Sequence, residues 1–181
     1  MEKMNGREEN EMSFQSVDVK SIQGNPWKMI GDEWMLIAAE NGGRVNAMTA
    51  SWGGVGIMWG KTVATAYIRP QRYTKEFVDA GDHFTLSFFG GDEKKAMGYL
   101  GKVSGREESD KIEKAGLHVI SLEGQPAFEE AKLVLVCRKL YAQELKPECF
   151  FGTEDIEKWY PGNDFHTMYI AEIVKAYQKN L

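Results

Sequence analysis

The sequence predicts a mainly β protein in which short helices interrupt an antiparallel, closed or nearly closed barrel. Six or more runs are rich in β-branched and aromatic residues and alternate with a period near two, as strands do. Turns containing glycine or asparagine separate several of these runs, which is typical of hairpin connections. A barrel is the simplest arrangement of such strands, because closure removes exposed strand edges.

The chain has 181 residues, of which 43% are hydrophobic and 27% are charged, with a net charge of −5. We expect a flexible arm over residues 1–15 and one domain over residues 16–181. The acidic balance argues against nucleic acid or an anionic membrane as the main partner. No apolar run approaches the ~20 residues that span a bilayer, and the first residues lack the apolar core of a signal peptide. Cys137 and Cys149 fit a reducing compartment, so we expect a cytoplasmic protein.

The first predicted strands form a hairpin. Residues 34–40 and 44–52 are apolar runs on either side of Asn41-Gly42-Gly43, a favourable hairpin turn. The glycines within residues 53–56 then break the pattern. Residues 62–69 alternate again and are β-branched, so they are predicted to form the next strand.

Short helices and strands alternate in the rest of the chain. Thr74 is a suitable N-cap for the first helix, and Ser109-Asp110 with Glu113 resembles a capping box for the last. The second half of the longest strand could instead be helical. The predicted helices span about residues 75–80, 92–100 and 109–116, and the predicted strands span residues 83–89, 118–122, 132–145 and 167–177.

Residues 46–74 bring together the groups that a phosphorylated ring compound needs. Thr49 and Ser51 can donate hydroxyl hydrogens. Arg69 and Arg72 carry planar, permanently charged forks suited to phosphate. Tryptophans add flat apolar surface, and glycines let the backbone approach a ligand closely. The pattern suits a ligand with a phosphate at one end and a ring system at the other.

Ordinary structural roles remain open for the same side chains. Thr49 and Ser51 could be hydroxyl pairs across neighbouring strands. Arg69 and Arg72 could be solvated charges at a strand end. Trp52 could belong to the core, since tryptophan is usually well buried.

Several catalytic and binding motifs fail on inspection. Residues 55–62, VGIMWGKT, lack the first P-loop glycine and run into a strand where a P-loop needs a helix. No G-x-G-x-x-G opens a helix, which argues against a Rossmann dinucleotide fold. The histidines, His83, His118 and His166, lack metal-ligand spacing, so no metal site is expected. No G-x-S-x-G elbow or Ser/His/Asp set is present.

Four segments in this order resemble the flavin reductase-like FMN-binding family, especially its small flavoredoxin-type members. They are NAMTASW, AYIRPQRYT, HFTLSFFG and LGKVSGREESDKIEKAGL, which cover roughly residues 34–117, with a weaker match in FHTMYIAEIV. The resemblance implies a split β-barrel, antiparallel and Greek-key-like. It also implies a homodimer that holds FMN non-covalently near the subunit interface.

The resemblance further implies which residues hold FMN. The segment from Asn46 to Trp52 would lie along the flavin. The ribityl phosphate would be held by Arg69 or Arg72, Tyr73 and the N–H groups near Thr74. A strand at residues 87–89 would border the ring, although Phe88 could instead be core. The implied cofactor-binding set is Asn46, Met48, Thr49, Ala50, Ser51, Trp52, Arg69, Arg72, Tyr73, Thr74, Ser87, Phe88, Phe89, Ser104 and Lys111.

His166, just before the last predicted strand, is the implied catalytic residue. It could position nicotinamide or adjust the charge near the flavin, since histidine titrates near neutral pH. Tyr160 and Asp164 could join it in a mobile loop over the site, in the same chain or across a dimer. A surface histidine at a strand end is the alternative.

The implied function is an oxidoreductase that passes electrons from NAD(P)H, a transient donor, through FMN to an acceptor. Free flavin, a ferric complex, oxygen or a redox protein could accept them, and the cofactor carries the chemistry. A flavoredoxin-type electron carrier without direct NAD(P)H activity is the main alternative. A barrel that binds no flavin and a role like that of pyridoxamine-phosphate oxidase also remain open.

Overall fold

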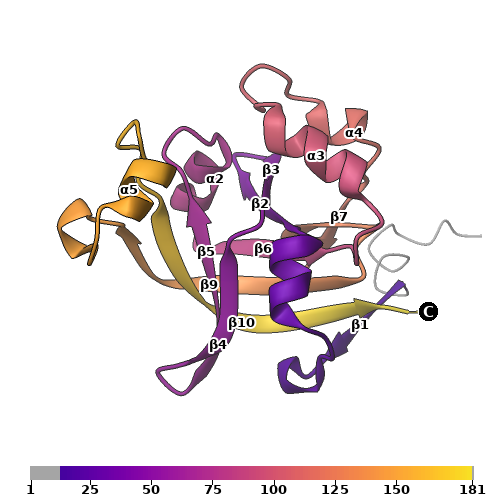
Figure 1. Ribbon diagram of the computed structural model, residues 1–181. Coiled ribbons are helices and arrows are strands. Elements are labelled where there is room, and N and C mark those ends of the chain that lie inside the picture. Colours follow the sequence, from indigo (N-terminus) through magenta and orange to yellow (C-terminus); the bar gives the residue numbers. More distant parts are fainter. Residues whose placement is uncertain (1–12, 181) are drawn as a thin grey trace, which may run out of the picture.

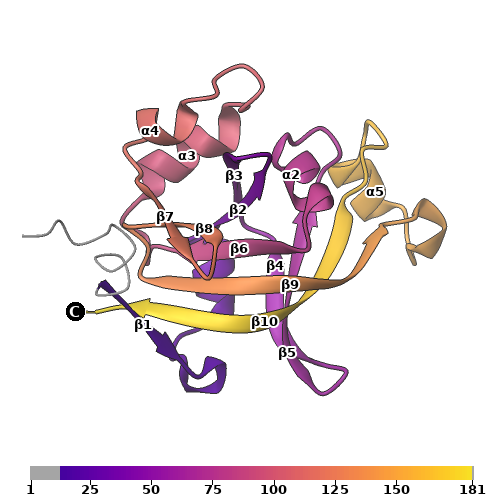
Figure 2. The same cartoon turned by 180° about the vertical axis from the view of Figure 1, so that it is seen from behind.

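One curved antiparallel sheet dominates residues 13–180, the part of the chain that the computed structural model describes (Figure 1). Its strand order is β3-β2-β6-β9-β10-β5-β4, and β1 adds to β10. A separate hairpin pairs β7 with β8, and Figure 2 shows it from behind. The strands are β1 (Phe14–Val17), β2 (Met35–Asn41), β3 (Arg44–Ala50), β4 (Gly53–Met58), β5 (Lys61–Ile68), β6 (His83–Phe88), β7 (Val119–Leu122), β8 (Gln125–Phe128), β9 (Leu133–Glu144) and β10 (Thr167–Lys179).

The sheet curls because its two edge strands are consecutive in the chain. β3 and β4 lie at opposite ends of the strand order, yet only Ser51 and Trp52 connect them. So short a link requires the two edges to approach each other. A Cβ atom on Gly53 would lie 2.9 Å from Cε of Met35 on β2, which shows how close they come. We call Ser51 and Trp52, which lie between the two edge strands, the seam. The predicted split barrel is confirmed.

Short helices accompany the sheet. In both views α2 lies between the α3–α4 pair and α5 (Figures 1 and 2). Gly81 follows α2 as its C-cap, as predicted, whereas the N-cap is Tyr73 and Thr74 is the first helical residue. Within the described residues, no helix has the length and apolar character that crossing a bilayer requires. The helices and shorter turns are η1 (Val19–Ser21), η2 (Lys28–Asp32), α2 (Thr74–Ala80), α3 (Lys94–Lys102), α4 (Lys111–Lys114), η3 (Pro147–Cys149) and α5 (Glu154–Trp159).

Strands β2 and β6 and the first five residues of β9 are buried on both faces, and two cores result. Met35 and Ile37 of β2 face the barrel interior, together with Phe77 of α2. The alternate residue Leu36 faces the outer core beneath α3 with Met97. Burying a large aliphatic or aromatic side chain contributes about 1.5–3 kcal/mol, so these two cores fix the strands that carry the site.

The largest difference from the sequence-based expectation is β4. The glycines at residues 53–56 do not break the chain pattern but form an edge strand that pairs with β5. Gly53 is required there, because a Cβ would lie 2.8 Å from the backbone oxygen of Thr65. β1, β8 and α5 were also not predicted, and β9 is a strand over its whole length.

The arm predicted over residues 1–15 lies outside the described residues up to position 12. Its last residues, Phe14 and Gln15, belong to β1 and pair with Lys179 and Gln178 of β10. Phe14 is only 4% exposed, because its ring packs in the outer core. The boundary of the sheet therefore lies before Phe14. The single domain over residues 16–181 remains a prediction.

Candidate functional site

Two basic side chains, the half-buried Arg72 and the buried Lys111, have no acidic partner among residues 13–180. Arg72 lies in the turn before α2, where burial lowers the pKa of its guanidinium. Lys111, at the start of α4, is 2% exposed, and its Nζ donates only to the backbone oxygen of Val103, at 3.0 Å. Burial, reinforced by the charge of Arg72, lowers the pKa of Lys111 to about 8. An anion beside these groups would offset both effects, since a nearby opposite charge favours the charged form.

Neutral polar groups complete this place. Nδ2 of Asn46, on β3, donates to Oγ1 of Thr74 at 2.8 Å, and both residues are buried. The loop after α3 passes so close to Asn46 that a Cβ on Gly105 would overlap its Oδ1. We call Asn46, Arg72, Thr74, Ser104 and Lys111 the anion pocket. Guanidinium, ammonium, hydroxyl and amide groups are the donors that a phosphate needs.

A cavity of about 290 Å³ lies at the other end of β3. It shares part of its wall with a neighbouring apolar cavity of about 570 Å³, which reaches Trp27 and Ile30. Flat rings and strand backbone dominate the smaller cavity, which suits a planar ligand. We call it the aromatic cavity, and it is lined by Met48, Thr49, Ala50, Ser51, Trp52, Tyr67, Arg69, Trp159 and His166.

His166 is a buried member of the aromatic cavity. Its Nδ1 lies 2.9 Å from the hydroxyl of Tyr160, and its ring centroid lies 4.9 Å from that of Trp52. Burial, together with the charge of Arg69, lowers the pKa of His166 to about 4. The imidazole is therefore neutral at pH 7. When the Tyr160 hydroxyl donates to Nδ1, Nε2 carries the ring hydrogen and can donate it to a ligand.

The segment that contains α5 covers the aromatic cavity. Arg69 pairs with the carboxylate of Asp164 and donates to the backbone oxygen of Trp159 at 2.7 Å. Gln71 also donates to Asp164, at 2.8 Å, and these two hydrogen bonds lower the pKa of that carboxyl. The ring of Trp159 meets Trp52 edge to face at 5.1 Å. The charge of Arg69 is thus committed to this segment, whereas that of Arg72 is not.

The free edge of β3 connects the anion pocket with the aromatic cavity. Within residues 13–180, β3 pairs with β2 only, so alternate N–H and C=O groups along its other edge have no strand partner there. This edge starts beside Asn46 and ends at the seam. Cations at one end, backbone donors and acceptors between, and aromatic walls at the other end form one elongated candidate site.

Comparison with known proteins assigns the chain to a family. The sequence model described as "Flavin reductase like domain" matches residues 29–180. The chain belongs to the flavin reductase like family. No curated protein sequence matches it significantly.

Solved structures of flavin reductase like proteins share the fold of this chain. An FMN-binding domain of flavin reductases-like enzyme from Shewanella baltica OS155 has a TM-score of 0.67 at 16% identity, covering 92% of this chain and 77% of that one. Flavoredoxin from Methanosarcina acetivorans has a TM-score of 0.61 at 22% identity, with 82% and 69% covered. An NADH:FAD oxidoreductase of Streptomyces globisporus C-1027, solved with NAD and FAD fragments, has a TM-score of 0.61 at 15% identity, with 81% and 74% covered.

The structure brings most of the predicted site residues of this flavin reductase like protein to the edge of β3. Arg72, rather than Arg69, is the arginine of the anion pocket. Tyr73 borders that pocket, and its ring contacts Phe77 at 5.0 Å. Thr49 donates through Oγ1 to the backbone oxygen of Met97 at 2.5 Å, so it is not part of a cross-strand hydroxyl pair. The predicted residues at this edge are Asn46, Met48, Thr49, Ala50, Ser51, Trp52, Arg69, Arg72, Tyr73, Thr74, Ser104, Lys111 and His166.

Three predicted ring neighbours lie apart from this edge. Ser87 and Phe88 are the last residues of β6 and Phe89 follows it, and β2 separates β6 from β3. Phe88 packs in the barrel interior, Phe89 packs in the outer core, and the buried hydroxyl of Ser87 has no hydrogen-bond partner among the described residues. Phe88 is therefore a core residue.

Exposure decides the structural roles of Trp52 and His166. Trp52 is 36% exposed beside the cavity and is not a core residue. His166 is 8% exposed and is not a surface histidine. Tyr67 and Trp159 are cavity walls that sequence reasoning missed. The alternation of β5 was a signal for Tyr67, whereas α5 carries no clear helix pattern that would mark Trp159.

One further group of potential metal ligands lies far from this edge in the fold. His118, Glu129 and Glu130 place ligand atoms within 4.8 Å of one another beside the β7–β8 hairpin. Nδ1 of His118 lies 2.5 Å from the carboxylate of Glu130, which raises the pKa of the imidazole. The backbone N–H of His118 also donates to that carboxylate. These contacts fasten the start of the hairpin.

Proposed function

We propose that this protein binds FMN along the edge of β3 and acts as an oxidoreductase that passes electrons from NAD(P)H through FMN to an acceptor. The observation that carries the proposal is a pair of cations, the half-buried Arg72 and the buried Lys111, at one end of an edge that leads to an aromatic cavity. Membership of the flavin reductase like family supports flavin as the ligand.

The residues present fit FMN in two respects. Arg72 and Lys111 would hold the phosphate, with hydroxyl donors from Thr74 and Ser104, because a phosphate dianion offsets two neighbouring positive charges. Trp52 and Tyr67 would enclose the ring. When bound, the flavin supplies hydride acceptance and electron release, which no side chain provides.

The protein's own contribution would be orientation and exclusion of water. The free N–H groups of β3 would donate to polar atoms of the ring and stabilise negative charge there. His166, neutral at pH 7, would donate from Nε2 without adding a charge beside Arg69. The α5 segment, fastened by Asp164, would shield the cavity from bulk water.

The proposal is tested by adding FMN or riboflavin to purified protein and following flavin fluorescence. We expect FMN to bind more tightly than riboflavin. Arg72→Ala should lower the affinity for FMN by about 100-fold or more and change the affinity for riboflavin little. Lys175→Ala is the matched control, because Lys175 is an exposed lysine on β10. Equal affinity of the wild type for FMN and riboflavin would contradict the assignment of the anion pocket.

His166→Ala tests the role of the imidazole. We expect flavin to remain bound and the rate of reduction by NADH or NADPH to change, because the residue lines the ring end and not the phosphate end. The rate is measured by anaerobic bleaching of the visible flavin spectrum. Loss of folded protein, detected by circular dichroism, would instead assign His166 a structural role with Tyr160.

A flavoredoxin-type electron carrier is the second candidate. The structural similarity to flavoredoxin from Methanosarcina acetivorans favours it. It predicts a yellow protein that a reduced protein partner bleaches but NADH and NADPH do not. The similarity to an NADH:FAD oxidoreductase favours the first candidate, which predicts bleaching by one of the two nucleotides.

The proposed function includes a homodimer in the cytoplasm. Large apolar side chains are exposed along β4 and its turn, with Ile57 68% and Trp59 58% exposed, and Trp27 is 83% exposed beside them. A patch of this kind marks a protein interface. Cys137 and Cys149 are both free thiols, which suits a reducing compartment.

A further inference from the structure

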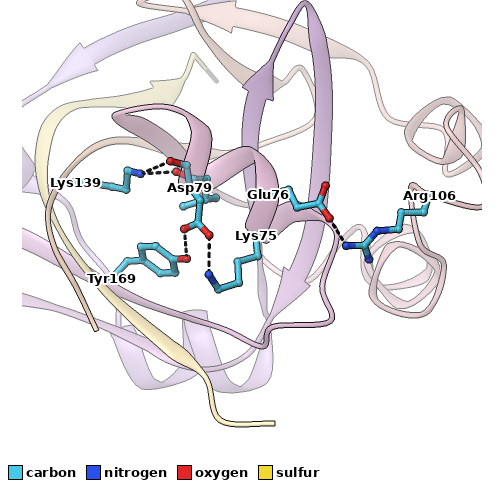
Figure 3. Close-up of polar contacts among 7 residues, drawn as sticks. Lys75, Glu76, Asp79, Arg106, Lys139 and Tyr169 are labelled. Atoms are coloured by element: carbon cyan, nitrogen blue, oxygen red, sulfur yellow. Dashed lines mark hydrogen bonds and ion pairs between the residues drawn. The ribbon is translucent and has the colours of Figure 1, made fainter. Parts of the chain in front are cut away.

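A single arginine fastens the loop between α3 and α4 to the segment before and within α2. Nη1 of Arg106 donates to the backbone oxygen of Gln71 at 3.1 Å, and Nη2 pairs with the carboxylate of Glu76. Its guanidinium carbon lies 4.8 Å from the centroid of the Tyr73 ring. Figure 3 shows Arg106 reaching from its own loop to Glu76 on α2. Two of these partners, Gln71 and Tyr73, are the chain neighbours of Arg72, and Glu76 lies in the first turn of α2.

The segment that Arg106 binds is itself anchored to the sheet. Lys139 of β9 donates from Nζ to the backbone oxygen of Val78 at 2.5 Å, at the end of α2 (Figure 3). The carboxylate of Asp79 accepts from the hydroxyl of Tyr169 on β10 at 2.6 Å and from Nζ of Lys75 at 2.6 Å. Arg106 thus connects a surface loop to a helix that two strands already hold.

The loop and the segment are the two walls of the anion pocket. The loop carries Ser104, whose Oγ accepts from the backbone N–H of Arg106 at 3.2 Å, and leads to Lys111. The segment carries Arg72 and Thr74. Lys111 and Arg72 carry like charges across the junction, and the charge of Arg72 adds to the effect of burial in lowering the pKa of Lys111. A contact that does not depend on the anion is needed to hold these walls together.

We propose that Arg106 is a positioning residue that sets the separation of the two walls and so determines the preference for a phosphorylated flavin. Its own charge is occupied by Glu76, so it acts on the ligand through Ser104 and Arg72. This inference rests on the proposed function, because it takes the ligand of the anion pocket to be the phosphate of FMN.

The rival arrangement has Arg106 leave Glu76 and bind the phosphate itself. The two arrangements predict opposite effects of Glu76→Gln. If Arg106 positions the walls, loss of its ionic partner loosens the loop and weakens FMN binding. If Arg106 binds the phosphate directly, the same change frees a cation and strengthens FMN binding. Glu107→Gln is the control, because it removes one negative charge from the same loop at an exposed position.

The experiment titrates wild type, Arg106→Ala, Arg106→Lys, Glu76→Gln and the double variant with FMN and with riboflavin. We expect Arg106→Ala to weaken FMN by about tenfold or more and to leave riboflavin unchanged, because only the phosphate end is disturbed. Glu76→Gln should weaken FMN less, and the double variant should match Arg106→Ala. Arg106→Lys should recover part of the FMN affinity, since lysine keeps the positive charge but cannot donate to Gln71 and Glu76 through two nitrogens of one planar group.

Three outcomes would overturn the inference: tighter FMN binding by Glu76→Gln, unchanged FMN binding by Arg106→Ala, or equal losses for FMN and riboflavin. The last would mean that Arg106 supports the fold in general, which thermal unfolding without flavin would also reveal. Wild-type protein that binds no FMN would overturn the proposed function itself. Wild-type binding with unaffected Arg106 variants would overturn only the role of Arg106.

Discussion

Lys111 is an unusual residue, since it is nearly inaccessible and still has its charge opposed by an arginine rather than balanced by a carboxylate. Its ammonium donates to a single backbone oxygen. Such a group is a poor contributor to the stability of the empty protein in its charged form. Under the proposed function Lys111 binds the phosphate, so its protonation state can be measured through the affinity for FMN.

We expect FMN affinity to fall as the pH rises above about 8, by up to about tenfold per pH unit, while riboflavin affinity stays constant. The sign follows from linkage: a phosphate raises the pKa of Lys111, so binding takes up a proton wherever the free lysine has lost it. Below pH 8 the lysine is already charged, and its contribution is flat. Fluorescence titrations between pH 7 and pH 10 measure this.

Lys111→Met is the control, and its FMN affinity should be weak and insensitive to pH over the same range. Linkage also fixes the effect on the flavin-free protein. The folded pKa of Lys111 lies below the unfolded value of 10.5, so the unfolded chain binds more protons between pH 8 and pH 10.5. Stability in that window therefore rises with pH through this group. An FMN affinity that does not change up to pH 10 would contradict the assignment.

At the scale of elements, two glycines of neighbouring segments have opposite requirements. Gly98 lies inside α3 with open space around its missing side chain. Gly98→Ala should therefore raise the free energy of unfolding by about 0.5–1 kcal/mol, because alanine favours a helix interior. A Cβ on Gly105 would meet Asn46 and Tyr73, so Gly105→Ala should lower it by about 1–3 kcal/mol.

Urea denaturation without flavin measures both free energies, and a flavin titration separates the two positions further. Gly105→Ala should also weaken FMN binding, since the shifted loop carries Ser104, whereas Gly98→Ala should bind FMN like the wild type. A stable Gly105→Ala protein with normal FMN affinity would show that the loop can move without opening the anion pocket.

The elements that the sequence predicted well are those with strong local signals. The β2–β3 hairpin was predicted because its turn needs two residues with positive φ, which Gly42 and Gly43 supply at 59° and 77°. β4 was missed because an edge strand needs backbone pairing more than side chains, and its glycines look like a break. β8 and α5 are too short to show a period.

The sequence predicted the kinds of side chain at the candidate site better than it predicted how they are arranged in space. Arg72 and Lys111 came from family segments far apart in the sequence, and only the fold shows that they share one pocket. The place of Ser87 could not be predicted, because alternation along β6 does not reveal that both of its faces are buried. The ion pair between Arg69 and Asp164 could not be predicted, because no local sequence pattern specifies the path of the loop that carries Asp164.

At the scale of the whole molecule, the two edges of the sheet have different surfaces. The β3 edge borders cations and a cavity, whereas β4 exposes Val55, Ile57 and Met58, followed by Trp59 in the turn to β5. An unpaired, apolar edge strand favours association, because its backbone and side chains both gain partners. Under the proposed function, the β3 edge would bind the flavin, and the β4 edge would suit a second copy of the chain.

We expect the wild type to sediment as a dimer and Ile57→Asp to sediment as a monomer, because a charge in the centre of an apolar interface is costly to bury. Val119→Asp is the control, since Val119 is 45% exposed on the β7–β8 hairpin, away from β4. Analytical ultracentrifugation distinguishes the states. A monomeric wild type, or a dimeric Ile57→Asp, would show that β4 is not the interface.

The seam has a consequence for how these two surfaces behave together. Since Ser51 and Trp52 alone join the ligand-binding edge to the associating edge, any rearrangement of that dipeptide reaches both. If cofactor binding and self-association are coupled in this way, each must change the equilibrium constant of the other by the same factor. If self-association tightens the grip on the yellow cofactor, the cofactor must tighten self-association to the same degree, and protein concentration becomes a determinant of how much holoprotein exists.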